Sequence, residues 1–185
     1  EGIEGLFGEL PFELTVGQKE FLTRFTTGKG HFALGGDAGS GKTTIMEILK
    51  KFYGDEIIFC ASTGVSAQQM PNGIGNGTAH KVLSLAFGIS DENDIKKVKK
   101  PCQALLGTSD LVRIIAVDEA FALDSDHLHV MLKRIERFNK HSNKRKKRQI
   151  RLLLIGDNLQ RLPIASDERK LELTDRYGHW LMFKS

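Results

Sequence analysis

Apolar residues recur at helical spacing in three stretches of the chain. In the first stretch, Phe21, Leu22 and Phe25 follow Thr15, whose hydroxyl can cap a helix, and the glycines at 28 and 30 end the pattern. The other two stretches contain Ile45, Ile48, Leu49 and Phe52, and then Leu128, Met131, Leu132, Ile135 and Phe138. We therefore predict three helices, of which the last runs from about 125 to 139.

Four short apolar runs alternate with these helices. They read "HFALG" at 31–35, "IIFCA" at 57–61, "IIAV" at 114–117 and "IRLLLI" at 150–155. A run that is apolar at nearly every position suits a strand covered on both faces, as in a parallel sheet flanked by helices. Strands that alternate with helices define the α/β class. We predict one α/β domain over residues 1–185 with a small inserted subdomain at about 88–108, where the alternation is interrupted.

The segment "GDAGSGKT" matches G-x-x-x-x-G-K-[ST] and lies between a predicted strand and a predicted helix. In this motif the backbone N–H groups point at phosphate oxygens, the lysine reaches the β- and γ-phosphates, and the hydroxyl after it binds Mg²⁺. A glycine-rich turn that arose by chance lacks the flanking strand and helix. The predicted nucleotide-binding residues are Gly36, Asp37, Ala38, Gly39, Ser40, Gly41, Lys42, Thr43 and Thr44.

Polar residues also follow the last two predicted strands. Asp118 and Glu119 come directly after "IIAV", at the carboxyl edge of the sheet, where ligands of open α/β sheets bind. Asp118 is our candidate ligand for Mg²⁺, together with Thr43, and Glu119 is the candidate general base. The dipole of a following helix explains one acid there but explains a pair less well. Gln160, in "GDNLQRLPI" after the fourth strand, is a candidate sensor of the γ-phosphate; the alternative is an ordinary loop residue.

These motifs, with "ASTGVSAQQ" at 61–69 and "GTAH" at 77–80, resemble in this order the first RecA-like motor domain of superfamily 1 DNA helicases. The nearest branch is the 5′-to-3′ one, with RecD-like, Dda-like and Pif-type enzymes, and the resemblance covers about 14–164. It implies that Gln18 contacts adenine and that Lys42, Glu119 and Gln160 are catalytic. The residues that it assigns to the backbone of single-stranded DNA are Ser62, Thr63, Gly64, Thr78 and His80. Taken alone, His80 is more typical of a packing histidine, and it is the surrounding motif that favours a DNA contact.

The resemblance implies an ATP-dependent 5′-to-3′ DNA helicase that uses ATP and Mg²⁺, acts on single-stranded and fork-like DNA in replication, repair or recombination, and is monomeric. A second RecA-like domain would supply an arginine finger, and no second domain follows Gln160 in these 185 residues. We interpret the final residues, "RYGHWLMFKS" at 176–185, as the beginning of a strand that would enter that domain. Two positions depart from the family pattern: Phe121 stands where a serine is usual, and Asp37 puts an acid inside the phosphate loop. The alternatives are another single-domain P-loop ATPase or kinase, and a DNA-binding module without turnover.

The net charge of +4 is concentrated in one segment. Residues 140–148, "KHSNKRKKR", hold six Lys or Arg, and without them the net charge is −2. Blocks of like charge repel and stay solvated, and the predicted topology places this run at the sheet edge opposite to the candidate site. We interpret it as a solvated loop; the alternative is an auxiliary contact with duplex DNA or an acidic partner. "KKVKK" at 96–100 is likewise either a solvated face or a DNA contact of the insertion.

No apolar stretch approaches the roughly 20 residues that are needed to span a bilayer, and the first residues do not form a charged and then apolar leader. We therefore expect no membrane partner. The expected location is the cytoplasm of a prokaryote or phage-infected cell, or the nucleus or mitochondrion of a eukaryote.

Overall fold

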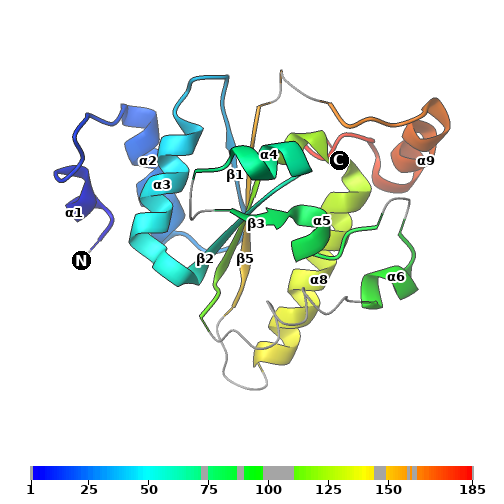
Figure 1. The fold of residues 1–185 in the computed structure, drawn as a ribbon. Helices are drawn as coiled ribbons and strands as arrows, with labels where there is room; N and C mark the ends of the chain where they lie inside the picture. Colours follow the sequence, from blue (N-terminus) through cyan, green and yellow to red (C-terminus); the bar gives the residue numbers. More distant parts are fainter. Residues whose placement is uncertain are drawn as a thin grey trace.

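The computed structural model describes residues 2–71, 75–86, 90–97, 111–143, 149–157, 159 and 162–184. Its centre is a sheet in which all neighbouring strands are parallel, in the order β1-β5-β4-β2-β3 (Figure 1). The strands are β1 (Phe32–Gly35), β2 (Ile57–Ala61), β3 (Gly75–Thr78), β4 (Ile114–Asp118) and β5 (Arg151–Gly156). The predicted α/β class and parallel sheet are confirmed.

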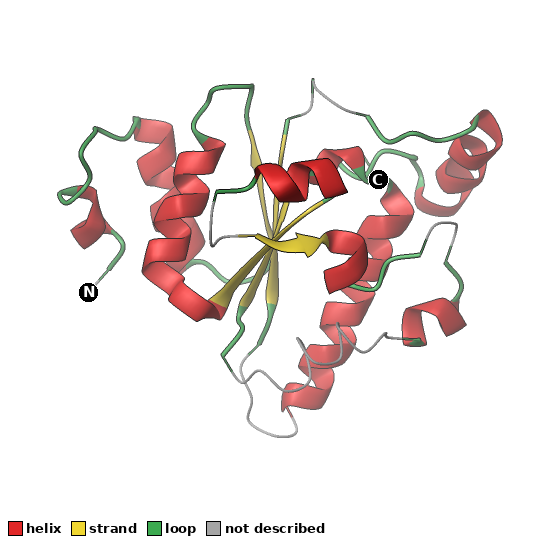
Figure 2. Ribbon diagram, viewed as in Figure 1, coloured by secondary structure: helices red, strands yellow, loops and turns green. Residues whose placement is uncertain are grey.

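Helices cover both faces of this sheet. Figure 1 shows α1, α2 and α3 on one side and α5, α6, α8 and α9 on the other, and in Figure 2 the strands form a single layer between them. The helices are α1 (Glu4–Phe7), α2 (Val16–Thr27), α3 (Lys42–Tyr53), α4 (Gly64–Gln69), α5 (Ala79–Val82), α6 (Glu92–Lys96), α8 (Ser125–Asn143) and α9 (Asp167–Tyr177), with short 3-10 turns η1 (Gly54–Glu56) and η2 (Ala120–Ala122).

The central strands are apolar on both faces because each face meets a different helix layer. In β2, Ile57 and Phe59 pack in the core beneath α2 and α3, while Ile58 and Cys60 pack in the core beneath α5 and α8. Side chains in β4 and β5 alternate between the same two cores. Burial on both faces is the physical reason why these runs lack a polar alternation.

Helix α2 begins and ends where local chemistry predicts. The Thr15 hydroxyl accepts the backbone N–H of Gln18 at 3.3 Å, and the Gln18 side chain accepts the backbone N–H of Thr15 at 3.0 Å. This reciprocal pair is a capping box, which satisfies two N–H groups that the helix cannot satisfy itself. The helix ends at Gly28, as predicted.

Three features differ from the sequence prediction. The described sheet has a further strand, β3, whose sequence "GNGT" carries no apolar signal. Residues 176–185, "RYGHWLMFKS", look in sequence like the beginning of a strand, but this prediction is wrong. Helix α9 includes Arg176 and Tyr177, and it ends at Gly178, which has a positive φ of 80°. Turns follow, with one isolated bridge from Leu181 to Asp124. Leu181 is buried against the core instead of extending a sheet.

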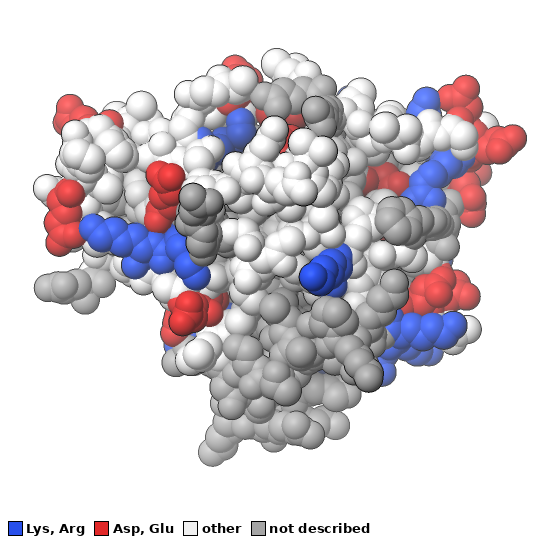
Figure 3. Space-filling model, in the orientation of Figure 1, with Lys and Arg blue, Asp and Glu red and all other residues white. Residues whose placement is uncertain are grey.

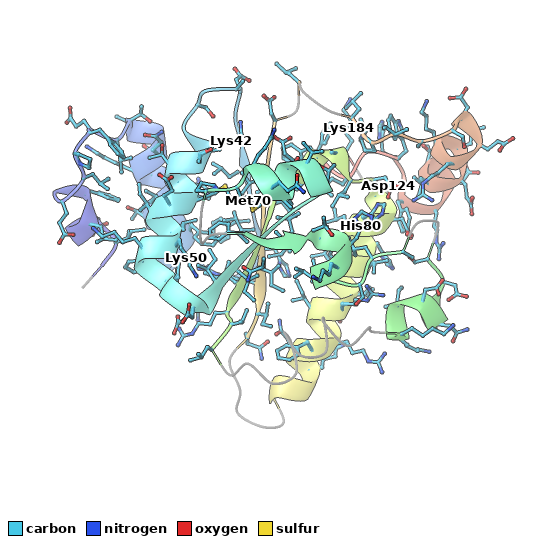
Figure 4. All side chains as sticks on the ribbon, in the orientation of Figure 1. Lys42, Lys50, Met70, His80, Asp124 and Lys184 are labelled. Atoms are coloured by element: carbon cyan, nitrogen blue, oxygen red, sulfur yellow. The ribbon has the colours of Figure 1, made fainter. Side chains whose placement is uncertain are left out.

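The third difference concerns the basic run. Helix α8 continues to Asn143, so residues 140–143 are helical and not part of a loop as predicted. The C-terminal end of α8 and the beginning of β5 lie at the sheet edge opposite to Lys42 (Figures 1 and 4), as the topology required. Residues 144–148 lie outside the described residues, as do 88, 89 and 98–108 of the predicted insertion, whose described part contains α6. No helix in the described ranges is long and apolar enough to cross a membrane.

Candidate functional site

The phosphate loop joins β1 to α3 at the carboxyl edge of the sheet. Gly39 and Gly41 have positive φ angles of 77° and 85°, a conformation that side chains other than that of glycine rarely adopt. A Cβ at Gly41 would also clash with the side-chain nitrogen of Gln18. The two glycines are therefore required by the shape of the loop and by its contact with α2.

Lys42 lies across this loop, at the top of the molecule in Figure 4. Its Nζ donates to the carbonyl oxygens of Gly36 at 2.6 Å and Asp37 at 2.8 Å. Two carbonyl oxygens of the loop thereby hold the ammonium group. Asp37 itself is exposed, which is the arrangement that lets an acid in this loop avoid the phosphates.

Gln18 reaches the same loop from α2. Its Nε2 donates to the carbonyl oxygen of Ser40 at 3.1 Å, while its Oε1 belongs to the capping box with Thr15. The structure thus brings the predicted adenine contact next to the phosphate loop. The adenine contact itself stays a prediction.

Asp118 ends β4 and Glu119 follows it, and β4 is separated from β1 by β5 alone. Burial raises the pKa of the Asp118 carboxyl, and the backbone N–H of Glu119, at 2.9 Å, and the charge of Lys42 oppose this shift. The positive charge of Lys42 therefore acts on Asp118 across the edge of the sheet. Glu119 has φ 51° and ψ 32°, the left-handed conformation. A residue other than glycine keeps this conformation only where its surroundings enforce it, and such residues concentrate at functional sites.

The residues after Glu119 form a buried turn. They form η2, and its central residue, Phe121, is buried with 6% exposure. The ring of Phe121 lies against Gly156 at the end of β5 and contacts the ring of Phe183 at a centroid distance of 5.4 Å. Phe121 thus fills the space at the strand ends with an aromatic ring. Sequence reasoning noted the residue as a departure but did not predict this packing.

Gln160 lies outside the described residues, so its predicted role stays a prediction. The strand before it ends as expected, at the same edge as the phosphate loop, since Gly36 donates its N–H to the carbonyl oxygen of Gly156 at 3.2 Å. The carboxylate of Asp157 is buried and accepts the N–H of Leu159 at 2.8 Å.

The residues that are predicted to contact single-stranded DNA, here called the strand-contact residues, lie together at the same sheet edge, beyond β4. β2 pairs with β3, and the register places Ala61 beside Thr78, so Ser62, Thr63 and Gly64 lie close to Thr78 and His80. The Thr63 hydroxyl caps α4 through Ser66 N–H at 3.1 Å, and the Thr78 hydroxyl caps α5 through the N–H of Lys81 at 3.3 Å. In Figure 3 the described surface over α4, β3 and α5 is largely uncharged. The Thr63 and Thr78 hydroxyls and backbone amides, more than a basic patch, are what this surface offers to a nucleic-acid backbone, whereas the side chain of Ser62 is buried.

A parallel sheet with a strand, phosphate loop and helix, and with an acidic pair at the end of a nearby strand, defines a P-loop nucleotide-binding fold. The model of the AAA domain family matches residues 13–175. The chain belongs to this family.

Solved structures with this fold include several Pif1 helicases. The chain is 21% identical to Pif1 helicase from Bacteroides in complex with ADP-AlF3 and ssDNA, with a TM-score of 0.74, and the match covers 94% of this chain and 39% of that one. It is 27% identical to Pif1 helicase from Candida albicans, with a TM-score of 0.61, over 94% of this chain and 37% of that one. The chain therefore spans about two fifths of the length of these proteins. Comparison with curated protein sequences gives no match.

Proposed function

We propose that this chain is the first RecA-like motor domain of an ATP-dependent 5′-to-3′ DNA helicase, which couples ATP hydrolysis to movement along single-stranded DNA and to unwinding. The observation that carries the proposal is the placement of two candidate sites on one sheet edge. The phosphate loop lies at β1, the acidic pair at β4, and the strand-contact residues at β2 and β3. Structures of Pif1 helicases with ADP-AlF3 and ssDNA and at forked dsDNA support it.

In this proposal, backbone N–H groups of residues 36–44 hold the phosphates, and Lys42 exchanges its loop carbonyls for the β- and γ-phosphate oxygens. Gln18 contacts the adenine. Glu119 accepts a proton from the attacking water or orients that water, and Gln160 contacts the γ-phosphate. The left-handed backbone conformation of Glu119 sets the direction in which its side chain leaves the end of β4.

The donor set suits Mg²⁺, because Mg²⁺ prefers oxygen ligands and retains several waters. Thr43 offers a hydroxyl in the first turn of α3 and Asp118 offers a carboxylate at the end of β4. These two residues would hold the ion, which neutralises charge on the phosphate oxygens when it is bound. Burial raises the pKa of Asp118 and thus disfavours its ionised form. A bound cation would act in the opposite direction and favour the ionised carboxylate.

The proposal includes a second RecA-like domain in the same polypeptide and action as a monomer. An arginine finger from that domain is commonly worth about 10³- to 10⁵-fold in rate. We therefore expect residues 1–185 alone to bind ATP weakly and to hydrolyse it very slowly. Robust turnover of ATP by this chain, stimulated by single-stranded DNA, would contradict this part of the proposal.

Two binding measurements test the proposal on this chain: a fluorescent ATP analogue with Mg²⁺, and a labelled oligothymidylate. Lys42→Ala should weaken nucleotide binding about tenfold to a hundredfold, since it removes hydrogen bonds to a charged group. Lys50→Ala is the matched control, because Lys50 lies in the last turn of the same helix and pairs with Asp55. Nucleotide binding without any oligothymidylate binding would exclude a helicase and favour another P-loop enzyme.

A further inference from the structure

A partly buried set of polar contacts connects helix α5 with helix α9. The ring of His80, on α5, packs edge-on against the ring of His127, on α8, with centroids 5.2 Å apart. Nδ1 of His127 lies 2.6 Å from a carboxylate oxygen of Asp124. The other oxygen of Asp124 accepts two hydrogen bonds from Arg169 of α9, at 3.0 and 2.6 Å. Figure 4 shows His80 and Asp124 beside each other.

Asp124 is the central residue of these contacts. Only 3% of the residue is exposed, and burial alone would raise its pKa. The hydrogen bonds and charge from His127, together with the hydrogen bond from Arg169, lower the pKa to about 2 instead. Asp124 is therefore ionised at neutral pH, and a buried carboxylate of this kind requires its partners to stay in place.

The same contacts determine how the two imidazole rings, of His127 and His80, are held. Asp124 accepts at Nδ1 of His127, which orients that ring in the first turn of α8. Nε2 of His127 is buried and has no hydrogen-bond partner among the described residues. The other side of His80 is held by a hydrogen bond to the backbone of Ser62, and burial lowers the pKa of His80. His80 is thus fixed between Ser62, a predicted DNA contact, and His127.

We propose that Asp124 and His127 are positioning residues that hold the ring of His80 in the orientation in which it contacts a single-stranded DNA backbone. This role rests on the proposed function, since it requires that the surface around His80 binds DNA. His127 acts through ring contact, and Asp124 acts through His127.

The same turn of α8 is tied to α9 more than once. The neighbouring Asp126, also buried, accepts the hydroxyl of Tyr177 at 2.6 Å and the N–H of Ser90 at 3.0 Å. Ser125 donates its N–H to the carbonyl oxygen of Trp180 at 3.1 Å. The first turn of α8, against which the ring of His80 packs, is thereby tied by hydrogen bonds to the segment that follows the nucleotide site along the chain.

A simpler account is that Asp124 only stabilises α8. Its carboxylate does accept the N–H of His127 at 3.2 Å, as a helix cap would. A cap of this kind needs no imidazole at position 127, so the two accounts differ in what replacement of His127 does to DNA binding.

Three variants separate the accounts. His127→Ala removes the ring and the hydrogen bond, whereas His127→Phe keeps a ring beside His80 and loses the hydrogen bond to Asp124. His129→Ala is the matched control, because His129 lies two residues further along the same helix and packs on Tyr177, at 5.3 Å between centroids. The measurements are the affinity for a labelled oligothymidylate at one fixed salt concentration and the ¹⁵N shifts of the His80 ring, with thermal unfolding as the check on folding.

We expect His127→Ala to weaken oligothymidylate binding about threefold to tenfold, the equivalent of one well-oriented hydrogen bond, and to shift the ¹⁵N signals of His80. His127→Phe should lie between His127→Ala and the unchanged protein, and His129→Ala should match the unchanged protein in both measurements. These results would support the positioning role even if all three variants lose similar stability.

Two outcomes would overturn the role, and they differ from each other. If the unchanged protein binds oligothymidylate and both His127 variants bind it equally well with unshifted His80 signals, the positioning role is wrong and the proposed function stands. If the unchanged protein binds no oligothymidylate, the proposed function fails and the positioning role fails with it.

Discussion

Replacement of Gly156 by alanine tests whether the ring of Phe121 is wedged against the end of β5. A Cβ at position 156 would lie 2.6 Å from Cδ2 and 2.9 Å from Cγ of Phe121, closer than carbon atoms approach in folded proteins. The ring cannot swing away freely, because it is buried at 6% exposure and packs on Phe183. Overpacking of this kind costs about 1–3 kcal/mol, and we expect Gly156→Ala to lower the free energy of unfolding by that amount.

Gly35 offers a matched control. It pairs with Gly156 in the register of β1 and β5, and a Cβ there would lie 4.0 Å from Phe121, an ordinary contact. Gly35→Ala should therefore change stability by less than about 0.5 kcal/mol, as a substitution without a clash does. Urea unfolding followed by circular dichroism measures both variants.

A second substitution locates the clash. Phe121→Leu shortens the side chain, so Gly156→Ala should be less destabilising in that background than in the unchanged protein, with a coupling of about 1 kcal/mol. Equal effects of Gly156→Ala and Gly35→Ala, or no coupling to Phe121, would refute the reasoning. The ring would then not be what limits the space at the strand ends.

Two further predictions concern groups that hold the helices in place. Arg134 is buried and donates to the carbonyl oxygens of Leu83 and of residues in α6. Arg134→Met should leave these carbonyls unpaired and lower the free energy of unfolding by about 3 kcal/mol, measured by thermal or urea unfolding. An unchanged stability would mean that this side chain does not hold α6. Because the pKa of Asp124 is lowered to about 2 from 3.8, its stabilisation is present above pH 4 and is lost as the pH falls through 2, about 2 kcal/mol in all; Asp124→Asn should flatten this acid limb of the stability curve, and an unaltered limb would contradict the shift.

The sequence predicts the central sheet well because each of its inner strands carries its own signal. β2, β4 and β5 are apolar on both faces, since both faces are covered. β3 could not be predicted in this way. Its residues, "GNGT", pair through the backbone at the edge of the sheet, and the two sheet cores contain none of their side chains. An edge strand that contributes only N–H and C=O groups leaves no hydrophobic pattern to read.

Local motifs likewise predict part of the candidate site. The phosphate loop and the acidic pair are contiguous in sequence, so their chemistry can be recognised before the fold is known. The contact of Gln18 with Ser40 joins residues 22 positions apart, and that of Arg169 with Asp124 joins residues 45 positions apart. No spacing rule connects such residues. The apolar residues of 178–184 misled for a related reason, because turns can bury Leu181 and Met182 as effectively as a strand can.

Asp118 interacts with both the nucleotide site and the strand-contact residues. Its carboxylate faces the charge of Lys42, while its carbonyl oxygen accepts the N–H of Ser62 at 3.0 Å. Ser62 is the first of the strand-contact residues, and its own side chain is buried. A single residue, Asp118, therefore connects the two candidate sites. Because the link is a backbone hydrogen bond at the end of β4, a displacement of Asp118 would be transmitted to the loop that begins α4.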